Sequence, residues 1–419
     1  MKPEPRPGQM PQGNVTGVVI LGGAHGTLAL ARSLGAKDVP VWLVSTDTPL
    51  PGWSRRIRHK FDWPGPDDPN AISFLLDLAQ KHGLAGALLI PGGDGEVRLV
   101  SQSIEALSPA FKIMLPSWDQ LKFVCEKPLL YRRATELSVD IPPTYRFTST
   151  EEAARAAIRF PVVLKPNMGG GGSELARAKV IRADDLASFD PVFQRAADEI
   201  GLDNVVVQEL IPGGGEGQFS YSALWHDGKP VAEFTARRAR QYPVDFGYTS
   251  TFVEVVDRPD AVDAARRLLT SIRHEGLVEI EFKRDARDGA LRLLDVNPRP
   301  WSWFGLASAA GIDLGAMIWE IANGRDPGRQ KTPRPGTAWM YLVRDMVSAV
   351  ILISRGKLGV GDYLRSFGAV RAWATFSASD PLPGLLDIPV TAWRVLTRRI
   401  LRLPARGSAG LAARNHPER

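Results

Sequence analysis

Apolar runs of strand length alternate with longer amphipathic segments over the first part of the chain. Residues 17–21 (GVVIL) and 41–47 (VWLVSTD) are typical of buried strands, and residues 71–83 (AISFLLDLAQKHG) have the period of a helix. Another strand and a turn follow in residues 86–97. Because strands that alternate with helices form parallel sheets, we expect an α/β domain with a doubly wound parallel sheet over residues 16–115.

The middle of the chain has a different pattern, in which strands are joined by glycine turns. Residues 161–180 and 204–243 have this pattern, residues 260–276 have a helical period, and residues 277–301 predict a hairpin. We therefore expect α+β structure after the first domain. The expected parts of the chain are a disordered tail (1–15), the parallel-sheet domain (16–115), two α+β subdomains (116–190 and 191–330) and a mainly helical extension (331–419).

The predicted hairpin carries acidic and amide side chains at matching places on its two arms. Glu281 follows Glu279 on one face of the first strand, and Asp295 and Asn297 share one face of the second. Folding brings Glu281 near Asp295 and Asn297, and adjacent carboxylates are costly unless a cation lies between them. These hard oxygen ligands suit Mg²⁺ or Mn²⁺ bound with nucleotide phosphates, and Arg299 follows where it can hold a phosphoryl oxygen. The alternative is a hairpin with a solvated acidic face.

Two further stretches have the composition of nucleotide-binding segments. One strand delivers Lys165, a point charge for phosphates, and backbone N–H groups of the glycine loop after it can approach phosphate oxygens. The residues of this loop are Gly169, Gly170, Gly171, Gly172 and Ser173. A second strand runs into Gln208, Glu209, Leu210 and Ile211, where backbone groups can pair with an adenine edge. Taken alone, the first can equally be a flexible loop and the second an ordinary strand end.

In their order along the chain, these segments resemble the ATP-grasp superfamily over roughly residues 17–325. The ordered set is Lys127, Lys165 with its glycine loop, residues 208–211, Glu281, and the motif Asp295-x-Asn297-x-Arg299. The resemblance is to the carbamoyl-phosphate-synthetase-like branch of carboxylate–amine ligases. It implies an ATP-grasp fold, in which residues 116–190 form the lid subdomain and the two α+β subdomains clamp ATP.

The resemblance also implies a role for each matching residue. Lys127 and Lys165 would contact the ATP phosphates under the glycine lid, Glu209 and Ile211 would border the adenine, and Glu216 would contact the ribose. Glu281, Asp295 and Asn297 would hold the metal ions, and Arg299 would stabilise the reacting phosphoryl and acyl groups. The family usually has glutamate where Asp295 stands, which leaves open whether one or two metal ions bind.

The function implied is the ADP-forming ligation of a small-molecule carboxylate, activated as an acyl phosphate, to an amine. ATP and Mg²⁺ (or Mn²⁺) are the expected cofactors. Alternatives are an ATP-grasp-type small-molecule kinase and a catalytically inactive ATP-binding sensor or scaffold. Arg240, which shares a face with Arg238 if residues 236–243 are a regular strand, is a candidate catalytic residue, with a solvated basic edge as the alternative. Asp94 and His25 follow strands at the edge where open α/β sheets bind ligands, so they are candidate substrate contacts.

The composition indicates which ligands and which cellular compartment suit the chain, but it adds no candidate site residue. The chain of 419 residues has a net charge of +6, which weakly favours anionic ligands, and no motif indicates nucleic-acid binding. The single cysteine, Cys125, excludes an intrachain disulfide, which fits a reducing cytoplasm. No apolar run is long enough to span a bilayer.

The end of the chain has the pattern of a basic amphipathic helix. Its apolar positions are Trp393, Leu396, Ile400 and Leu403, and its basic positions are Arg394, Arg398, Arg399 and Arg402. Such a helix can make peripheral contact with an anionic membrane. It can equally pack on the body of the enzyme or on a partner subunit, as in a homodimer.

Overall fold

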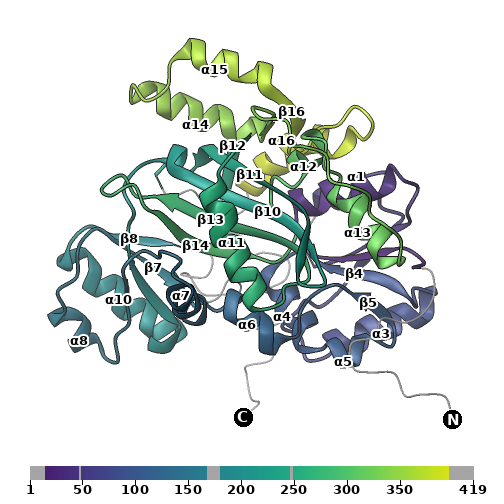
Figure 1. The fold of residues 1–419 in the computed structure, drawn as a ribbon, viewed down its shortest axis with the longest axis horizontal. Helices are drawn as coiled ribbons and strands as arrows, with labels where there is room; N and C mark the ends of the chain where they lie inside the picture. The colour runs from purple at the N-terminus through teal and green to yellow at the C-terminus, as the bar shows by residue number, and fades with distance from the viewer. Residues whose placement is uncertain (1–14, 47–48, 168–179, 246–248, 396–419) are drawn as a thin grey trace.

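The computed structural model describes residues 15–46, 49–167, 180–245 and 249–395, and within these residues the strands form three sheets (Figure 1). The first sheet has five strands, the second four and the third seven. Helices lie on the sheets, and the last part of the chain lies beside the third sheet, so the architecture is α/β with α+β parts.

The first sheet is built from strands that alternate with helices, as the apolar runs predicted. Its strands are all parallel and lie in the order β3-β2-β1-β4-β5. The elements are β1 (Val18–Leu21), α1 (His25–Gly35), β2 (Val41–Ser45), α2 (Pro49–Gly52), β3 (His59–Asp62), α3 (Ala71–His82), β4 (Ala87–Pro91), α4 (Asp94–Gln102), α5 (Ile104–Leu107) and β5 (Phe111–Ile113).

Helices cover both faces of this sheet, which explains why its strands are uninterrupted apolar runs. Successive residues of a strand point to opposite faces. Val19 and Leu21 of β1 pack in the core that contains α3 and α4, whereas Val18 and Ile20 pack in the core that contains α1. The doubly wound parallel sheet is therefore confirmed.

A pair of helices connects the first sheet to the second. The helical pattern from Ser117 is interrupted at Pro128, and the structure has two helices there, α6 (Trp118–Cys125) and α7 (Lys127–Glu136). Proline is tolerated in the first turn of a helix because its missing N–H would be unpaired there in any case, so α7 begins just before Pro128. The Tyr131 hydroxyl donates to the Leu294 carbonyl 3.1 Å away, which ties α7 to β14.

The second sheet is antiparallel, with the strand order β6-β9-β7-β8. Apolar side chains of α8 and α10 pack on it in a core of their own. The elements are β6 (Thr144–Tyr145), α8 (Thr150–Arg155), β7 (Val162–Pro166), β8 (Ile181–Ala183), α10 (Leu186–Ile200), η1 (Leu202–Asn204) and β9 (Val205–Glu209).

The third sheet has the order β14-β13-β10-β11-β12-β15-β16 and carries the predicted hairpin at one edge. Strands β13 and β14 pair antiparallel, with Glu279 opposite Asn297 and Glu281 opposite Asp295, so the hairpin is confirmed. The elements are η2 (Gly215–Gly217), β10 (Gln218–His226), β11 (Lys229–Tyr242), β12 (Thr249–Val256), α11 (Pro259–Ser271), β13 (Gly276–Arg284), β14 (Leu291–Asn297), α12 (Gly305–Ala309) and α13 (Leu314–Ala322).

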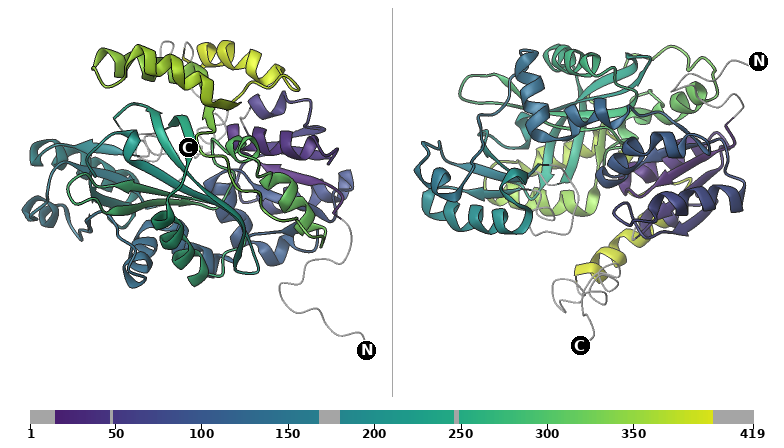
Figure 2. Two further views of the ribbon diagram at one scale, coloured as in Figure 1. Left: turned by 45° about the horizontal axis from the view of Figure 1, so that its top comes forward. Right: turned by 90° about the horizontal axis from the view of Figure 1, so that it is seen from below.

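The C-terminal part contributes strands to the third sheet as well as helices. Strand β15 pairs with β12, and β16 pairs with β15, so these two strands extend the sheet. Helices α14 to α16 lie together at the top of the molecule in Figure 1, and the tilted view of Figure 2 agrees. The elements are β15 (Ala338–Met340), α14 (Leu342–Ser354), α15 (Val360–Ser366), η3 (Phe367–Ala369), β16 (Val370–Trp373) and α16 (Leu382–Val395).

Candidate active site

The hairpin brings its acidic and amide side chains together as its sequence predicted. The Glu279 carboxylate is 3% exposed and accepts hydrogen bonds from Ser220 Oγ at 3.0 Å and Asn297 Nδ2 at 3.3 Å. Burial, and then the charge of Glu281, raise the pKa of Glu279 above its ordinary value. Asn297 thus donates to one carboxylate, and its amide oxygen is left to accept from another side chain.

Both predicted phosphate-binding lysines lie beside this hairpin. Lys127 Nζ is 3.3 Å and 3.4 Å from the two carboxylate oxygens of Asp295. The Lys127 backbone N–H donates to the Asn167 carbonyl at 3.0 Å, which ties the start of α7 to the residue after β7. Because Lys165 is on β7, this contact brings the two lysines close together. Lys165 Nζ donates to Gln208 Oε1 on the neighbouring strand at 2.9 Å.

The two lysines differ in their electrostatic setting. Burial, and after it the positive charge of Lys127, lower the pKa of Lys165 to about 8, although Asp295 and Glu281 act in the opposite direction. Burial acts on Lys127 in the same direction, but Asp295, Tyr131 and Asp94 together outweigh it, and the pKa of Lys127 lies above its ordinary value. Lys165 therefore shares one electrostatic environment with Lys127 and the hairpin carboxylates.

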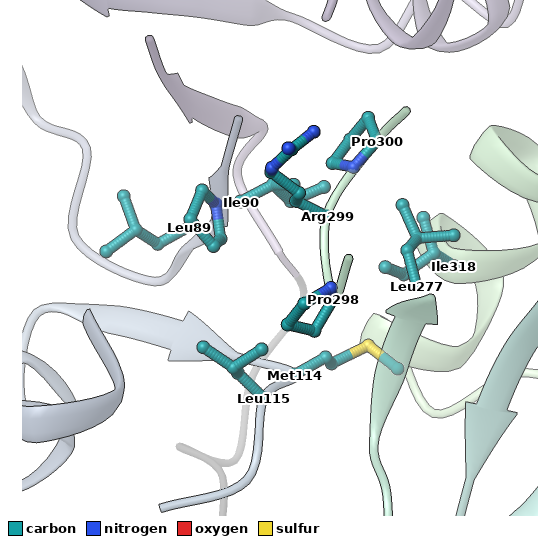
Figure 3. A pocket seen from close by; sticks show the side chains of 10 residues that line it. Leu89, Ile90, Met114, Leu115, Leu277, Pro298, Arg299, Pro300 and Ile318 are labelled. Atoms are coloured by element: carbon teal, nitrogen blue, oxygen red, sulfur yellow. The ribbon is translucent and has the colours of Figure 1, made fainter. Parts of the chain in front are cut away.

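Arg299 joins the hairpin to the first sheet. Its Nη2 donates to the Asn297 amide oxygen at 3.1 Å, and its Nε donates to Asp94 at the start of α4. A small apolar pocket lies beside it, lined by residues of β4 and residues 298–300 (Figure 3). The candidate substrate contact Asp94 thus lies next to Arg299. We call Lys127, Lys165, Arg238, Glu281, Asp295, Asn297 and Arg299 the charged cluster.

His25 has other surroundings. Its ring centroid is 4.6 Å from that of Tyr341, and burial lowers the pKa of His25 to about 4. At neutral pH the imidazole is therefore uncharged and packs against an aromatic ring. Among the described residues, none of the hydrogen bonds joins the His25 side chain to the hairpin. The role of His25 as a substrate contact stays a prediction.

Arg238 reaches the hairpin, and Arg240 does not. Strand β11 has a register shift between these two residues, and such a bulge ends the regular alternation that would put them on one face. Arg238 Nη2 lies 2.9 Å from Glu281 Oε1. Arg240 instead pairs with the buried Asp345 of α14, and its guanidinium lies 4.1 Å from the centroid of the Phe252 ring. The expectation that Arg238 and Arg240 share one face is corrected, because the bulge directs the Arg240 guanidinium to Asp345 in the C-terminal part, and the catalytic role of Arg240 stays a prediction.

The residues expected around the adenine lie at the end of β9. Glu209 is 5% exposed and is contacted by Tyr145 Oη at 3.1 Å and Arg287 Nη1 at 3.2 Å. Leu210 N donates to the Pro161 carbonyl, and Ile211 is buried. Glu216 accepts from the backbone N–H of Gly214 at 3.0 Å. The structure thus puts Glu209 and Ile211 beside Gln208, the partner of Lys165, while adenine and ribose contact stay predictions.

The glycine loop is outside the part of the chain that the structure describes. The loop begins at Gly169, three residues after Pro166, which is the last residue of β7. Its other residues are Gly170, Gly171, Gly172 and Ser173. Their expected role as a lid over the phosphates stays a prediction.

The hairpin has the donor chemistry that a magnesium site needs. Within the described ranges, no three His, Cys, Asp or Glu side chains are grouped so that they could hold a metal by themselves. Glu281 and Asp295 are register partners, and Asn297 Oδ1 adds a third hard oxygen. Mg²⁺ typically takes one or two protein carboxylates and completes its shell with water and substrate phosphates, so this donor set fits a metal that arrives with a nucleotide.

Several members of this region were not predicted as site residues from the sequence. Arg238 was missed because the bulge in β11 has no mark in the sequence. Glu279 lies two residues before Glu281, and the alternation of the strand was sufficient to indicate it. Tyr145 and Arg287 contact Glu209 from distant segments, and nothing local in the sequence points to them.

Comparison with known sequences gives one family and one curated relative. The family described as "ATP-grasp in the biosynthetic pathway with Ter operon" matches residues 223–343. The D-aspartate ligase of Enterococcus faecium (strain Aus0004) is 22% identical over 317 residues, which are 72% of this chain and 75% of the relative.

Solved structures of several enzymes have a similar fold. The L-amino acid ligase of Bacillus licheniformis has a TM-score of 0.59 at 14% identity, over 78% of this chain and 79% of that one. The biotin carboxylase domain of Hydrogenobacter thermophilus 2-oxoglutarate carboxylase, in complex with MgADP, ADP and bicarbonate, has a TM-score of 0.60 at 15% identity, over 79% and 74%. Rhizobium etli pyruvate carboxylase matches 78% of this chain, which spans 30% of that longer protein, with a TM-score of 0.58 at 16% identity.

Proposed function

This chain has the ATP-grasp fold that its ordered motifs predicted, and from this premise we propose that it is an ATP-dependent carboxylate–amine ligase that forms ADP. One observation carries the proposal. The charged cluster joins two lysines, two arginines, two carboxylates and an amide oxygen from four separate parts of the chain, with Lys127 Nζ 3.3 Å from Asp295. Carboxylates for a metal next to cations for phosphates are what a metal–nucleotide complex requires.

Each part of the charged cluster has a role in this proposal. Lys127 and Lys165 bind oxygens of the triphosphate as compact charges. Glu281, Asp295 and Asn297 hold Mg²⁺ or Mn²⁺, which when bound offsets phosphate charge during transfer. Arg299 has two donors directed at Asn297 and Asp94, and in the complex its guanidinium holds the oxygens of the reacting phosphoryl and acyl groups. Arg238 holds the Glu281 carboxylate in place through an ion pair.

The chemistry that we propose has two steps. An oxygen of the substrate carboxylate attacks the γ-phosphorus of ATP, and the bond to the bridging oxygen of ADP breaks. The amine nitrogen of the second substrate then attacks the acyl carbon, inorganic phosphate leaves with the bonding electron pair, and the amine loses a proton. The protein holds the reactants in line and screens the acyl phosphate from water. The curated relative makes D-aspartate a first candidate for the carboxylate substrate.

Replacement of the metal ligands tests the proposal. We expect Asp295→Ala and Asn297→Ala to lower Mg²⁺-dependent turnover of ATP by at least about 100-fold, because each removes a ligand that offsets transferred charge. Release of ADP and phosphate would be measured with D-aspartate and a panel of other amino acids and small carboxylates, each with and without an added amine. Mass spectrometry of the product separates an amide from a phosphate ester.

The turn of the same hairpin supplies a matched control. Asp288→Ala removes an acid from the Asp285–Gly289 turn, away from the charged cluster, and we expect wild-type turnover. Wild-type turnover in both Asp295→Ala and Asn297→Ala, with thermal unfolding unchanged, would contradict the metal assignment. A stable phosphate ester as the product would indicate a kinase in place of a ligase.

A further inference from the structure

The exposed apolar side chains of this protein are gathered in its C-terminal part. Among the described residues, twelve large hydrophobic side chains are exposed, and eleven of them lie between Leu342 and Trp393. Single exposed apolar residues are normal on a protein surface, but a concentration of them indicates an interaction site. We call Leu342, Met346, Val347, Val350, Val360, Leu364, Leu382, Leu385 and Ile388 the C-terminal apolar face.

Helix α14 presents its apolar side to solvent and its polar side to the protein. Its buried residues are Asp345, Ser348 and Ala349. Asp345 pairs with Arg240, and Ser348 Oγ donates to the Gln241 carbonyl at 2.8 Å. The residues at i, i+4 and i+8 on the outer side are Leu342, Met346 and Val350, with exposed fractions of 39%, 54% and 67%. A surface helix of a soluble domain normally has the reverse arrangement.

Helix α16 is arranged in the same way. Its buried acid, Asp387, accepts a hydrogen bond from Tyr341 Oη at 3.1 Å and is 2% exposed. Leu382, Leu385 and Ile388 follow one another at helical spacing on the outer side and are 47%, 64% and 62% exposed. Figures 1 and 2 show α14, α15 and α16 at the same end of the molecule. Helices α14 and α16 both expose apolar side chains to water at this end of the molecule. Burying these side chains against a partner is therefore favourable.

The charge of the chain is concentrated in the same segment. Residues 342–419 contain twelve Lys and Arg against five Asp and Glu, a net charge of +7, whereas the rest of the chain has a net charge of −1. Three of the five acids, Asp345, Asp380 and Asp387, are buried and paired inside the protein. From residue 388 to residue 417 the sequence has six arginines and no acid.

We propose that the C-terminal apolar face binds the surface of an anionic lipid bilayer, to which the arginines of the sequence after residue 388 are attracted by their charge. The apolar side chains enter the boundary between headgroups and acyl chains, and the arginines contact lipid phosphates, which is how interfacial helices bind. A second copy of this chain fits less well as the partner, because two copies carry the same excess of positive charge in residues 342–419 and repel one another. An anionic bilayer offers an apolar interior for the exposed side chains and negatively charged phosphates for the arginines.

Vesicle co-sedimentation of the full chain tests the proposal. We expect the protein to pellet with vesicles that contain phosphatidylglycerol, to pellet much less with vesicles of phosphatidylcholine alone, and to be released at about 0.5 M NaCl, where charges are screened within a few ångströms. The triple variant Arg398→Gln, Arg399→Gln and Arg402→Gln should lower the partition coefficient by about 100-fold, at about fivefold for each arginine.

A second variant tests the apolar contribution. Val350→Ser, Leu385→Ser and Ile388→Ser together should lower the partition coefficient by about tenfold or more, because they remove apolar area from the face. Two controls match these variants. Leu186→Ser changes the one exposed large hydrophobic residue of the described chain that lies outside the C-terminal part, and Arg329→Gln, Lys331→Gln and Arg334→Gln change three exposed cations of the loop between α13 and β15. Both controls should bind vesicles like the wild type.

The outcomes separate the candidates. Failure of the wild type to pellet with anionic vesicles would overturn the proposal, as would equal losses in the variants and their controls. A dimer in sedimentation equilibrium that the Val350, Leu385 and Ile388 substitutions dissociate, without vesicle binding, would assign the face to a second copy of the chain. Thermal unfolding of each variant verifies that the fold is intact, and the assay does not depend on ligase activity.

Discussion

At the scale of single residues, the two lysines of the charged cluster are expected to respond differently to pH. Lys165 is partly buried, with Lys127 and Lys283 opposing its charge and Asp295 and Glu281 favouring it. Its pKa of about 8 means that the free protein loses this charge just above neutral pH. Lys127 has a raised pKa and keeps its charge over the same range.

We therefore predict that ATP affinity falls as pH rises through about 8. The ammonium form of Lys165 binds phosphate and the neutral amine does not, so the Kd for ATP should rise by about tenfold between pH 7 and pH 9. Lys165→Arg should remove this dependence, because guanidinium stays charged. Isothermal titration calorimetry at fixed free Mg²⁺ would measure it.

Lys127→Arg is the matched control for this experiment, and it should keep the pH dependence of the wild type. The same slope of Kd against pH in wild type and Lys165→Arg would show that another group titrates. It would then exclude Lys165 as the phosphate-binding residue with the lowered pKa.

Residues of the site could be predicted from sequence where their partners are fixed by a strand or a turn. Glu281, Asp295 and Asn297 could be placed together because alternation and a short turn determine a hairpin register. Lys165 and Gln208 could be named for their own strands, but their contact depends on the pairing of β7 with β9. Arg287 at Glu209 and Asp94 at Arg299 join segments far apart in sequence, and no local pattern determines such contacts.

At the scale of elements, strand β11 shows how one extra residue changes the role of a side chain. The alternation of residues 236–243 predicts Arg238 and Arg240 on one face, and the bulge between them directs Arg238 to β13 and Arg240 to α14. Strands β15 and β16 were hard to predict for another reason. They have three and four residues, and their pairing partners are set by the tertiary fold.

The ion pair of Arg240 and Asp345 should determine how firmly α14 is held on the sheet. Arg240 and Asp345 are 6% and 0% exposed, so Arg240→Met leaves a buried carboxylate without its cation. We predict a loss of about 3–5 kcal/mol in the free energy of unfolding, with the KM for ATP unchanged in the folded protein. Denaturant unfolding monitored by circular dichroism, together with steady-state kinetics, would measure both.

Two controls make this prediction specific. The double variant Arg240→Met and Asp345→Leu removes both charges and should recover much of the stability. Arg355→Met breaks an exposed pair with Asp245 and should cost less than about 1 kcal/mol. If Arg240→Met keeps wild-type stability and loses turnover, Arg240 is catalytic after all and the role assigned from its contacts is wrong.

At the scale of the whole molecule, Asp380 closes the last part of the chain onto the first sheet. Its carboxylate accepts from Arg32 Nε at 2.8 Å, Ser54 Oγ at 2.7 Å and the Arg55 backbone N–H at 3.0 Å. Arg32 Nη2 also donates to the Thr375 carbonyl at 2.7 Å. The segment before α16 is thus fixed to α1 although the two are more than 300 residues apart in sequence.

Asp380→Ala should loosen this closure and leave the charged cluster intact. It leaves Arg32 without its carboxylate, and we predict a loss of about 3–5 kcal/mol in stability at pH 7. Trypsin should cut faster between residues 365 and 395, and the KM for ATP should not change. Burial acts to raise the pKa of Asp380, but hydrogen bonds from Arg32 and Ser54 outweigh it and hold the pKa below its ordinary value of 3.8.

The sign of this shift gives the prediction its control. A carboxylate whose pKa is lowered by folding contributes stability above its unfolded pKa and loses that contribution as pH falls through its folded pKa. The difference in stability between wild type and Asp380→Ala should therefore be full at pH 7 and shrink steadily below about pH 4. A difference that stays constant down to pH 3 would mean that the variant acts through lost packing, and that the charge of Asp380 does not hold the two ends of the molecule together.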